Sequence, residues 1–186
     1  MTRNLPSKIS TAQVNALRAE LPSVDLKPGE IHFADTPTLI SSVLGSCVSV
    51  CLYSPEKKLG AMCHCLLPSR KNSQGRCHNP LCCVDSCVSQ MVETFSRKHK
   101  LPRHSLQAKL FGGANVLETG IPKTAEGVTV GSRNIEAARL VLQQHDLAIT
   151  AERVGGEQGY KLFFHTGTGE VFLRHVQNSR LEELQK

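Results

Sequence analysis

Two apolar segments joined by a short turn are the feature that most constrains the fold of this chain. Residues 47–53 alternate between apolar and smaller or more polar side chains, which is the period of a β-strand. The next four residues, Ser54-Pro55-Glu56-Lys57, suit a type I turn, because that turn favours proline at its second position. A second apolar segment covers residues 58–67 and ends at Pro68, which cannot donate to a strand ladder. The sequence therefore predicts an antiparallel β-hairpin over residues 47–67.

This hairpin is expected to bring a cysteine and a histidine together. If the turn holds an even number of residues, Tyr53 faces Lys58 and Cys47 faces His64. Opposed residues have Cβ atoms about 4.5–5.5 Å apart on one face of a sheet. Cys47 would then be a thiol nucleophile and His64 its base. A slip of one residue would instead pair Cys47 with Cys65 and turn His64 to the other face. The alternative to a catalytic pair is a small buried cysteine near a hydrogen-bonded sheet histidine.

The composition limits what the protein can bind. With 22 Lys and Arg against 16 Asp and Glu, the formal net charge of the 186 residues is +6. Aromatic residues make up only 4% of the chain and Trp is absent, so there is little surface on which single-stranded bases could stack. A mildly basic face that meets an acidic protein partner is therefore favoured over nucleic-acid binding.

The sequence also indicates where the protein works. No apolar run reaches the roughly eighteen residues of a membrane span, and the polar N-terminal residues do not resemble a signal peptide. We therefore expect a cytoplasmic protein without membrane insertion. In that compartment the eight cysteines are expected to be thiols rather than disulfides, serving catalysis, metal binding or core packing.

The predicted elements mix helices with strands, which favours an α+β sandwich of mixed or antiparallel β-sheet with flanking helices. Residues 1–27 are polar and are predicted to be an N-terminal extension with one short helix over residues 11–20. Residues 28–186 are predicted to form a single domain. Besides the hairpin, its expected strands cover residues 31–34, 39–44, 107–111, 128–130, 148–152, 160–164 and 170–175. Its expected helices run from Cys83 to Lys98 and from a Ser132 cap to His145.

Several motifs follow one another along the chain. They are Leu44-Gly45-Ser46-Cys47-Val48-Ser49-Val50, Gly60-Ala61-Met62-Cys63-His64-Cys65-Leu66-Leu67-Pro68, Lys109-Leu110-Phe111-Gly112-Gly113-Ala114-Asn115-Val116, Gly131-Ser132-Arg133-Asn134, Val154-Gly155-Gly156, Thr166-Gly167 and Thr168-Gly169. This ordered set resembles the signature of the CheD family of chemoreceptor glutamine deamidases. The resemblance covers about residues 28–175.

The resemblance implies a CheD-like cysteine hydrolase fold and a function. It implies a protein-glutamine glutaminase that acts on the helical cytoplasmic region of methyl-accepting chemotaxis receptors through a thioester. Cys47 would be the nucleophile and His64 the base, with no metal and no organic cofactor. The family's third catalytic position is a threonine before the Gly-Ser-Cys turn. Here that segment is Ser41-Ser42, and gapless counting favours Ser41, with Ser42 as the fallback.

The resemblance also implies partners and leaves an alternative. Some family members hydrolyse glutamate methyl esters, and many bind a CheC-like phosphatase. The alternative to an enzyme is a non-catalytic chemotaxis adaptor, which binds receptors or a CheC-like phosphatase. It would have lost turnover because the threonine is replaced by serine or because the loop is altered.

The remaining cysteines support weaker hypotheses. Residues 77–87 contain Cys77, His78, Cys82, Cys83 and Cys87, but their spacing is not a usual zinc pattern, so thiols without a metal are favoured. Residues 63 and 65 are also cysteines, and in a strand they point away from His64 into a core.

A histidine and two glycine pairs are further candidates for chemistry. His165, which precedes a Thr-Gly turn, is the main rival to His64 as the base. The glycine pairs at 112–113 and 155–156 do not have the spacing of phosphate-binding loops, so they are interpreted as turns.

Overall fold

Two five-stranded sheets packed face to face form the centre of the computed structural model, which describes residues 6–70, 79–116 and 129–176. Sheet A has the order β1-β10-β9-β4-β2, with bounds Ser7–Lys8, Val171–His175, Tyr160–His165, Leu39–Leu44 and Ser23–Asp25. Sheet B has the order β3-β6-β5-β7-β8, with bounds Glu30–Ala34, Leu59–His64, Val48–Ser54, Gln107–Gly112 and Ile149–Val154. Both sheets mix parallel and antiparallel pairs.

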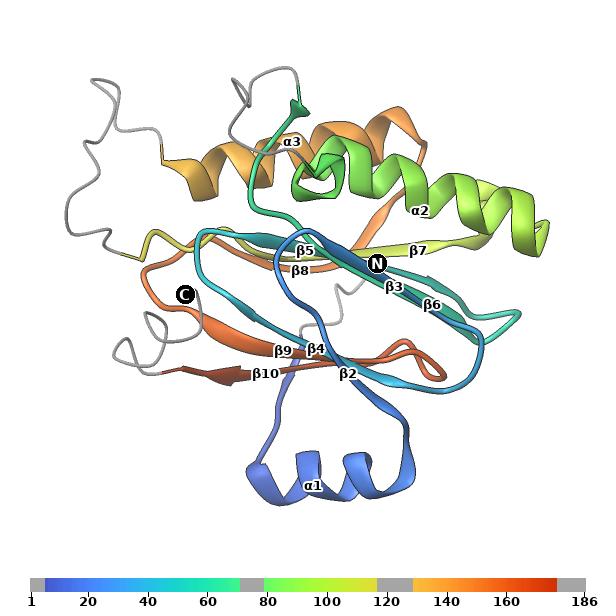
Figure 1. The fold of residues 1–186 in the computed structure, drawn as a ribbon, viewed down its shortest axis with the longest axis vertical. Coiled ribbons are helices and arrows are strands. Elements are labelled where there is room, and N and C mark those ends of the chain that lie inside the picture. The colour runs from blue at the N-terminus through green and yellow to red at the C-terminus, as the bar shows by residue number, and fades with distance from the viewer. Residues whose placement is uncertain (1–5, 71–78, 117–128, 177–186) are drawn as a thin grey trace.

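Helices cover the outer face of each sheet (Figure 1). Helices α2 (Val84–His99) and α3 (Val130–Gln144) lie on sheet B, and α1 (Thr11–Glu20) lies on the side of sheet A. Two short 3₁₀ turns, η2 (Pro80–Cys82) and η3 (Arg103–Ser105), flank α2. The predicted α+β sandwich with flanking helices is confirmed.

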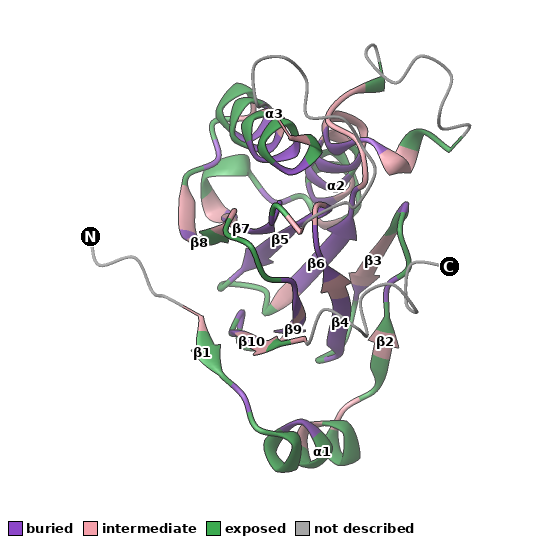
Figure 2. Ribbon diagram, turned by 90° about the vertical axis from the view of Figure 1, so that its left-hand side faces the viewer, coloured by how far each residue is buried: buried purple, intermediate pink, exposed green. Residues whose placement is uncertain are grey.

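The central hairpin strand explains how one segment serves two cores. Val48, Val50 and Leu52 of β5 pack with α2 and α3, whereas Cys51 and Tyr53 face the space between the sheets. Every residue of β5 is buried, as Figure 2 shows. The period-2 alternation therefore directs successive side chains of β5 into two different apolar cores. Cys47 belongs to the core between the two sheets.

The register of the hairpin differs from the prediction. Tyr53 pairs with Gly60, not with Lys58, and Ser54 pairs with Leu59. The turn thus consists of residues 55–58, and Lys58 adopts a left-handed φ of 53° that ends it. The turn begins one residue later than expected because Ser54 still belongs to the strand. Each partner therefore moves by two positions, an even shift that leaves every side chain on its expected face.

A second correction concerns the start of α3. The predicted strand over residues 128–130 is wrong at its described end, because Val130 is the first residue of the helix. Thr129 is the N-cap and forms a capping box with Ser132, so the residue expected to cap the helix lies inside its first turn. Residue 128 lies outside the described residues.

The N-terminal segment joins sheet A at both edges. The predicted helix over residues 11–20 is confirmed as α1. Strand β1 pairs in parallel with β10, and β2 pairs in parallel with β4. The division of the chain at residue 27 stays a prediction. None of the helices in the described ranges is long and apolar enough to span a membrane.

Candidate active site

One cavity contains the cysteine and the histidine that the hairpin was expected to unite. It has a volume of about 680 Å³ and lies where β4 and β6 end and β5 begins. Its lining residues are Asp25, Leu26, Lys27, Pro28, Ser42, Val43, Ser46, Cys47, His64, Leu66, Leu67, Val130 and Lys161. The structure therefore places Cys47 and His64 in the same cavity, although they are not directly opposed in the ladder.

The turn that carries Cys47 is held through its carbonyl groups by the end of β7. Gly113 N–H donates to the Cys47 carbonyl, and Ala114 N–H donates to the Gly45 carbonyl, both at 2.8 Å. Gly112 and Gly113 have positive φ values of 102° and 69°. A Cβ at Gly112 would collide with the Cys47 carbonyl oxygen, so only glycine permits this close approach. The interpretation of this glycine pair as a turn is wrong, because Gly112 is the last residue of β7 and pairs with Val48 and Val154. The pair instead fixes the turn that carries the cysteine.

Asn134 of α3 ties the same turn to the segment after the histidine. Its side chain is fully buried, and its Nδ2 donates to the carbonyls of Ser46 at 3.1 Å and Leu66 at 2.9 Å. Asn134 belongs to the motif Gly131-Ser132-Arg133-Asn134, which does not by itself reveal this role. The feature of the sequence that could have indicated this role is an asparagine at an inward position of an amphipathic helix, because a buried amide needs hydrogen-bond partners.

His64 is the last residue of β6 and is only 3% exposed. Its Nδ1 lies 2.7 Å from Ser42 Oγ, and the Ser42 hydroxyl donates to the Leu26 carbonyl at 3.0 Å. A serine hydroxyl has one proton, and a carbonyl can only accept. The hydroxyl proton therefore goes to Leu26, and His64 Nδ1–H donates to Ser42. The lone pair of the neutral imidazole is then on Nε2, which is the nitrogen available to a substrate or thiol.

Burial sets the charge of this imidazole. It lowers the pKa of His64 below its usual value, although contact with the Leu26 backbone and the nearby Cys63 and Glu30 oppose the effect. Nε2 is buried and makes no hydrogen bond within the described residues. His64 is thus a neutral imidazole whose Nδ1 is held in place by Ser42.

Ser41 and Ser42 lie on opposite faces of β4. Ser42 shares its face with Ile40 and Leu44, which pack between the sheets. The Ser41 hydroxyl instead donates to the Asp25 carboxylate. The structure thus places the hydroxyl of Ser42, the fallback residue, on His64, and the hydroxyl of Ser41, the favoured residue, away from it. Counting residues back from the Gly-Ser-Cys turn cannot decide between Ser41 and Ser42. Neighbouring residues of a strand lie on opposite faces, and the count does not show which face meets the histidine.

A charged cluster borders the cavity. Asp25 accepts from Lys161 Nζ at 2.8 Å and forms an ion pair with Arg18 at 3.1 Å. Partial burial of Asp25 raises the pKa of its carboxyl, but the hydrogen bonds from Lys161 and Ser41 outweigh this, and the net shift is downward. Asp25 therefore stays ionised and holds Lys161 at the rim.

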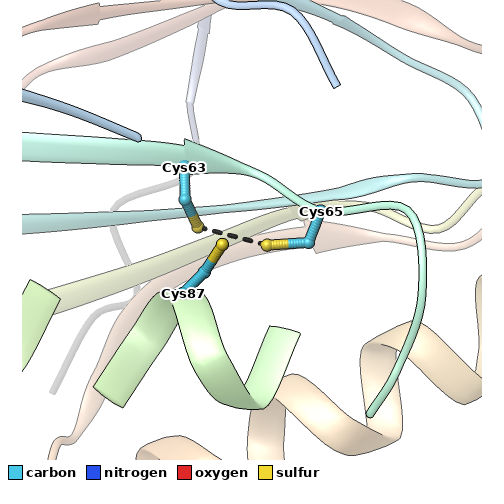
Figure 3. A group of neighbouring side chains, drawn as sticks. All are labelled: Cys63, Cys65 and Cys87. Carbon is cyan, nitrogen blue, oxygen red and sulfur yellow. Dashed lines mark hydrogen bonds between the residues drawn. The ribbon is translucent and has the colours of Figure 1, made fainter. Parts of the chain in front are cut away.

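The other predicted residues lie elsewhere. His165 accepts a hydrogen bond at Nδ1 from Gly167 N–H at 3.1 Å, and it does not line the cavity. Cys63 and Cys65 face away from His64 into the core under α2, as predicted, where they meet Cys87 (Figure 3). Cys77 and His78 lie outside the described residues. The expectation that every cysteine is a thiol is wrong for Cys82, which is disulfide-bonded.

A thiol and a neutral, oriented imidazole that line the same cavity are a constellation for nucleophilic attack on a carbonyl carbon. Cys47 is a thiol with 9% of its surface exposed, which is enough to line the cavity but little enough to exclude most water. The hydrogen bonds to the carbonyls of Gly45, Ser46 and Cys47 hold the backbone of this turn in place before a substrate arrives.

Comparisons with known proteins agree with the signature in the sequence. The family model described as CheD chemotactic sensory transduction matches residues 66–175. The chain is 43% identical over 169 residues to a probable chemoreceptor glutamine deamidase CheD of Geobacter sulfurreducens, covering 91% of this chain and 99% of that protein. It is 35% identical to a probable chemoreceptor glutamine deamidase CheD of Nitratidesulfovibrio vulgaris, covering 93% and 89% of the two chains.

More distant similarities extend the set. The chain is 33% identical to a probable chemoreceptor glutamine deamidase CheD of Thermococcus kodakarensis, covering 83% of this chain and 94% of that protein. Among solved structures, it is similar to the hypothetical protein YfiH of Bacillus licheniformis, with a TM-score of 0.44 and 10% identity over 83% of this chain and 63% of that one. This last likeness is too distant to inform the site.

Proposed function

This chain belongs to the CheD family, and we propose that it is a deamidase that converts glutamines of chemotaxis receptors to glutamate. One observation carries the proposal. The cavity that holds Cys47 also holds His64, whose ring is oriented by the Ser42 hydroxyl so that Nε2 has the lone pair. A nucleophile, a base and an orienting group are the three parts that cysteine-dependent acyl transfer requires.

The first half of the proposed reaction forms a thioester. His64 Nε2 takes the proton of Cys47, and the thiolate attacks the carbonyl carbon of the glutamine side chain. A C–S bond forms while the electron pair of the C=O bond moves to oxygen. When that pair returns, the C–N bond breaks, and the imidazolium gives its proton to the departing nitrogen, which leaves as ammonia.

The second half consumes one water molecule. His64 Nε2, neutral again, takes a proton from water while the hydroxide attacks the thioester carbon. The C–S bond then breaks, the thiolate regains its proton from His64, and glutamate remains. Throughout both halves of the reaction, His64 Nδ1–H keeps its proton and donates it in a hydrogen bond to the Ser42 hydroxyl. Ser42 is therefore a positioning residue rather than a proton carrier.

The cavity suits a glutamine side chain on a helix. Its lining includes Leu66, Leu67 and Val130, which can contact the apolar face of a receptor helix. Lys27 and Lys161 at the rim are complementary to acidic residues of such a helix. A glutamate methyl ester fits the same cycle with methanol as the leaving group.

The setting follows from the substrate. The modified glutamines are proposed to lie in the cytoplasmic region of the receptors, so the reaction takes place in the cytoplasm. A CheC-like phosphatase is proposed as a second protein partner.

The test uses a purified cytoplasmic fragment of a methyl-accepting chemotaxis receptor. We expect the wild-type protein to release ammonia and to convert specific glutamines to glutamate, read by peptide mass spectrometry. Cys47→Ala and His64→Ala should be inactive, while Cys83→Ala, which changes a buried cysteine outside the cavity, should be active. A folded wild-type protein that binds the fragment but is as inert as both variants would favour the non-catalytic adaptor instead.

A further inference from the structure

Three cysteines that the proposed reaction does not use converge under α2. Cys63 comes from the end of β6, Cys65 from the residue after His64, and Cys87 from α2. All three are fully buried, and their sulfur atoms all lie within 4.8 Å of one another. Figure 3 shows the three side chains pointing toward a common centre, with Cys63 and Cys65 sulfurs 3.5 Å apart.

The dimensions of this cluster suit a metal ion at its centre. A first-row metal ion lies roughly 2.3 Å from a thiolate sulfur, which places three sulfurs around it roughly 4 Å apart in a trigonal arrangement. The sulfurs here are separated by 3.5 Å at the shortest printed pair and by no more than 4.8 Å at any pair. Coordination would therefore require side-chain shifts of only a fraction of an ångström per atom, without a change of fold.

The chemistry of the donors selects the kind of ion. Within the parts of the chain that the structure describes, the group contains three sulfurs and no histidine or carboxylate. Structural zinc takes four ligands, and calcium or magnesium takes oxygen ligands. Thiolates alone suit a soft ion such as Cu(I).

We propose that Cys63, Cys65 and Cys87 form a binding site for one soft, thiophilic metal ion, of which Cu(I) is the type. Binding exchanges S–H bonds for S–Cu bonds, and each thiol that becomes a thiolate releases one proton to solvent without any change of oxidation state. The site is on the opposite face of sheet B from the cavity. It does not depend on the proposed deamidase activity.

Its position gives the site a consequence. Cys63 and Cys65 are the two chain neighbours of His64, so an ion that holds both sulfurs also fixes the backbone on either side of the histidine. Metal loading is therefore expected to change the ring environment of His64, which is observable as a shift of its imidazole resonances in NMR spectra.

The test is a titration of the reduced full-length protein with Cu(I), as its acetonitrile complex, without oxygen and against a chromogenic Cu(I) chelator. We expect one ion to be bound per chain, with near-ultraviolet absorption from sulfur-to-copper charge transfer. Cys87→Ala should lose this one equivalent, whereas Cys83→Ala, which changes a neighbouring cysteine outside the cluster, should keep it. No uptake in competition with the chelator, or unchanged uptake by Cys87→Ala, would overturn the proposal.

A second measurement covers the case in which Cys87→Ala does not fold. X-ray absorption at the copper edge of the loaded wild-type protein counts the sulfur neighbours directly. Three sulfurs are expected, and a shell of nitrogen or oxygen would rule out the thiol cluster as the site.

Discussion

Removal of the Ser42 hydroxyl tests how the histidine is oriented. In Ser42→Ala, His64 Nδ1–H loses its acceptor at 2.7 Å and the Leu26 carbonyl loses its donor at 3.0 Å. Leu26 and His64 are both buried, so each group is left short of a hydrogen bond. A buried polar group without its partner costs about 1–3 kcal/mol, so we expect the free energy of unfolding to fall by an amount of this order.

The catalytic effect should be of similar size. During thiol deprotonation His64 becomes an imidazolium, and a hydrogen bond from a charged group is worth about 1.5–3 kcal/mol. Since about 1.4 kcal/mol corresponds to a factor of ten, Ser42→Ala should lower kcat/KM roughly 10- to 100-fold. The loss should be mainly in kcat, because the hydroxyl contacts the histidine rather than the substrate.

The assay is steady-state ammonia release from a receptor fragment by three variants. Ser41→Ala is the matched control, since it removes a buried hydroxyl from the same strand that contacts Asp25 rather than His64. Ser41→Ala and Ser42→Thr, which keeps the hydroxyl, should both have activity near that of the wild type. Wild-type kcat in Ser42→Ala, or an equal loss in Ser41→Ala, would refute the reasoning.

Three other predictions concern the frame of the site. Asn134→Ala removes two hydrogen bonds to backbone carbonyls, so it should lower the free energy of unfolding by about 1–3 kcal/mol, measured by urea titration. The same variant should also have a lower kcat. An unchanged free energy of unfolding and an unchanged kcat would show that Asn134 does not position the turn. Gly112→Ala should lose both stability and deamidation, because its Cβ would collide with the Cys47 carbonyl oxygen. Gly155 has a φ of 74° but open space around it, so Gly155→Ala should show only backbone strain and remain active. Equal losses in the two variants would contradict the proposed collision at Gly112. Burial raises the pKa of Tyr160 to about 12, so the fold favours its protonated form, and the stability this contributes should be lost as the pH rises from about 10 towards about 12. In Tyr53→Phe, which leaves Tyr160 as the one tyrosine of the chain, absorbance titration should show little tyrosinate near pH 10 in the folded protein but about half ionisation there in urea. Half ionisation of Tyr160 near pH 10 in the folded state would contradict this prediction.

Local patterns in the sequence were sufficient to predict most of the elements and the faces of the hairpin. The alternation in β5 and the turn after it correctly placed Cys47 and His64 on one face. The predicted register was wrong because a turn of four residues can begin at either of two neighbouring positions, and Ser54 belongs to the strand rather than to the turn. Neither choice changes the parity of the ladder, so Cys47 and His64 keep their expected face.

The details that the sequence did not reveal depend on contacts between distant segments. Ser42 meets His64 because β4 and β6 belong to different sheets that pack face to face, and no local pattern encodes that packing. In the same way, Asn134 reaches the cysteine turn from a helix 88 positions away in sequence. The edge strands β1 and β2 are only two and three residues long, too short to show any periodicity.

The central claim is that Cys47 is the nucleophile, and covalent labelling tests it most directly. The protein is treated with an electrophilic ketone analogue of glutamine until deamidation of the receptor fragment stops, and the modified residue is then located by peptide mapping. The account predicts modification of Cys47, in proportion to the loss of activity, among the eight cysteines of the chain. Complete inactivation with Cys47 unmodified, or deamidation by Cys47→Ala at the wild-type rate, would contradict it.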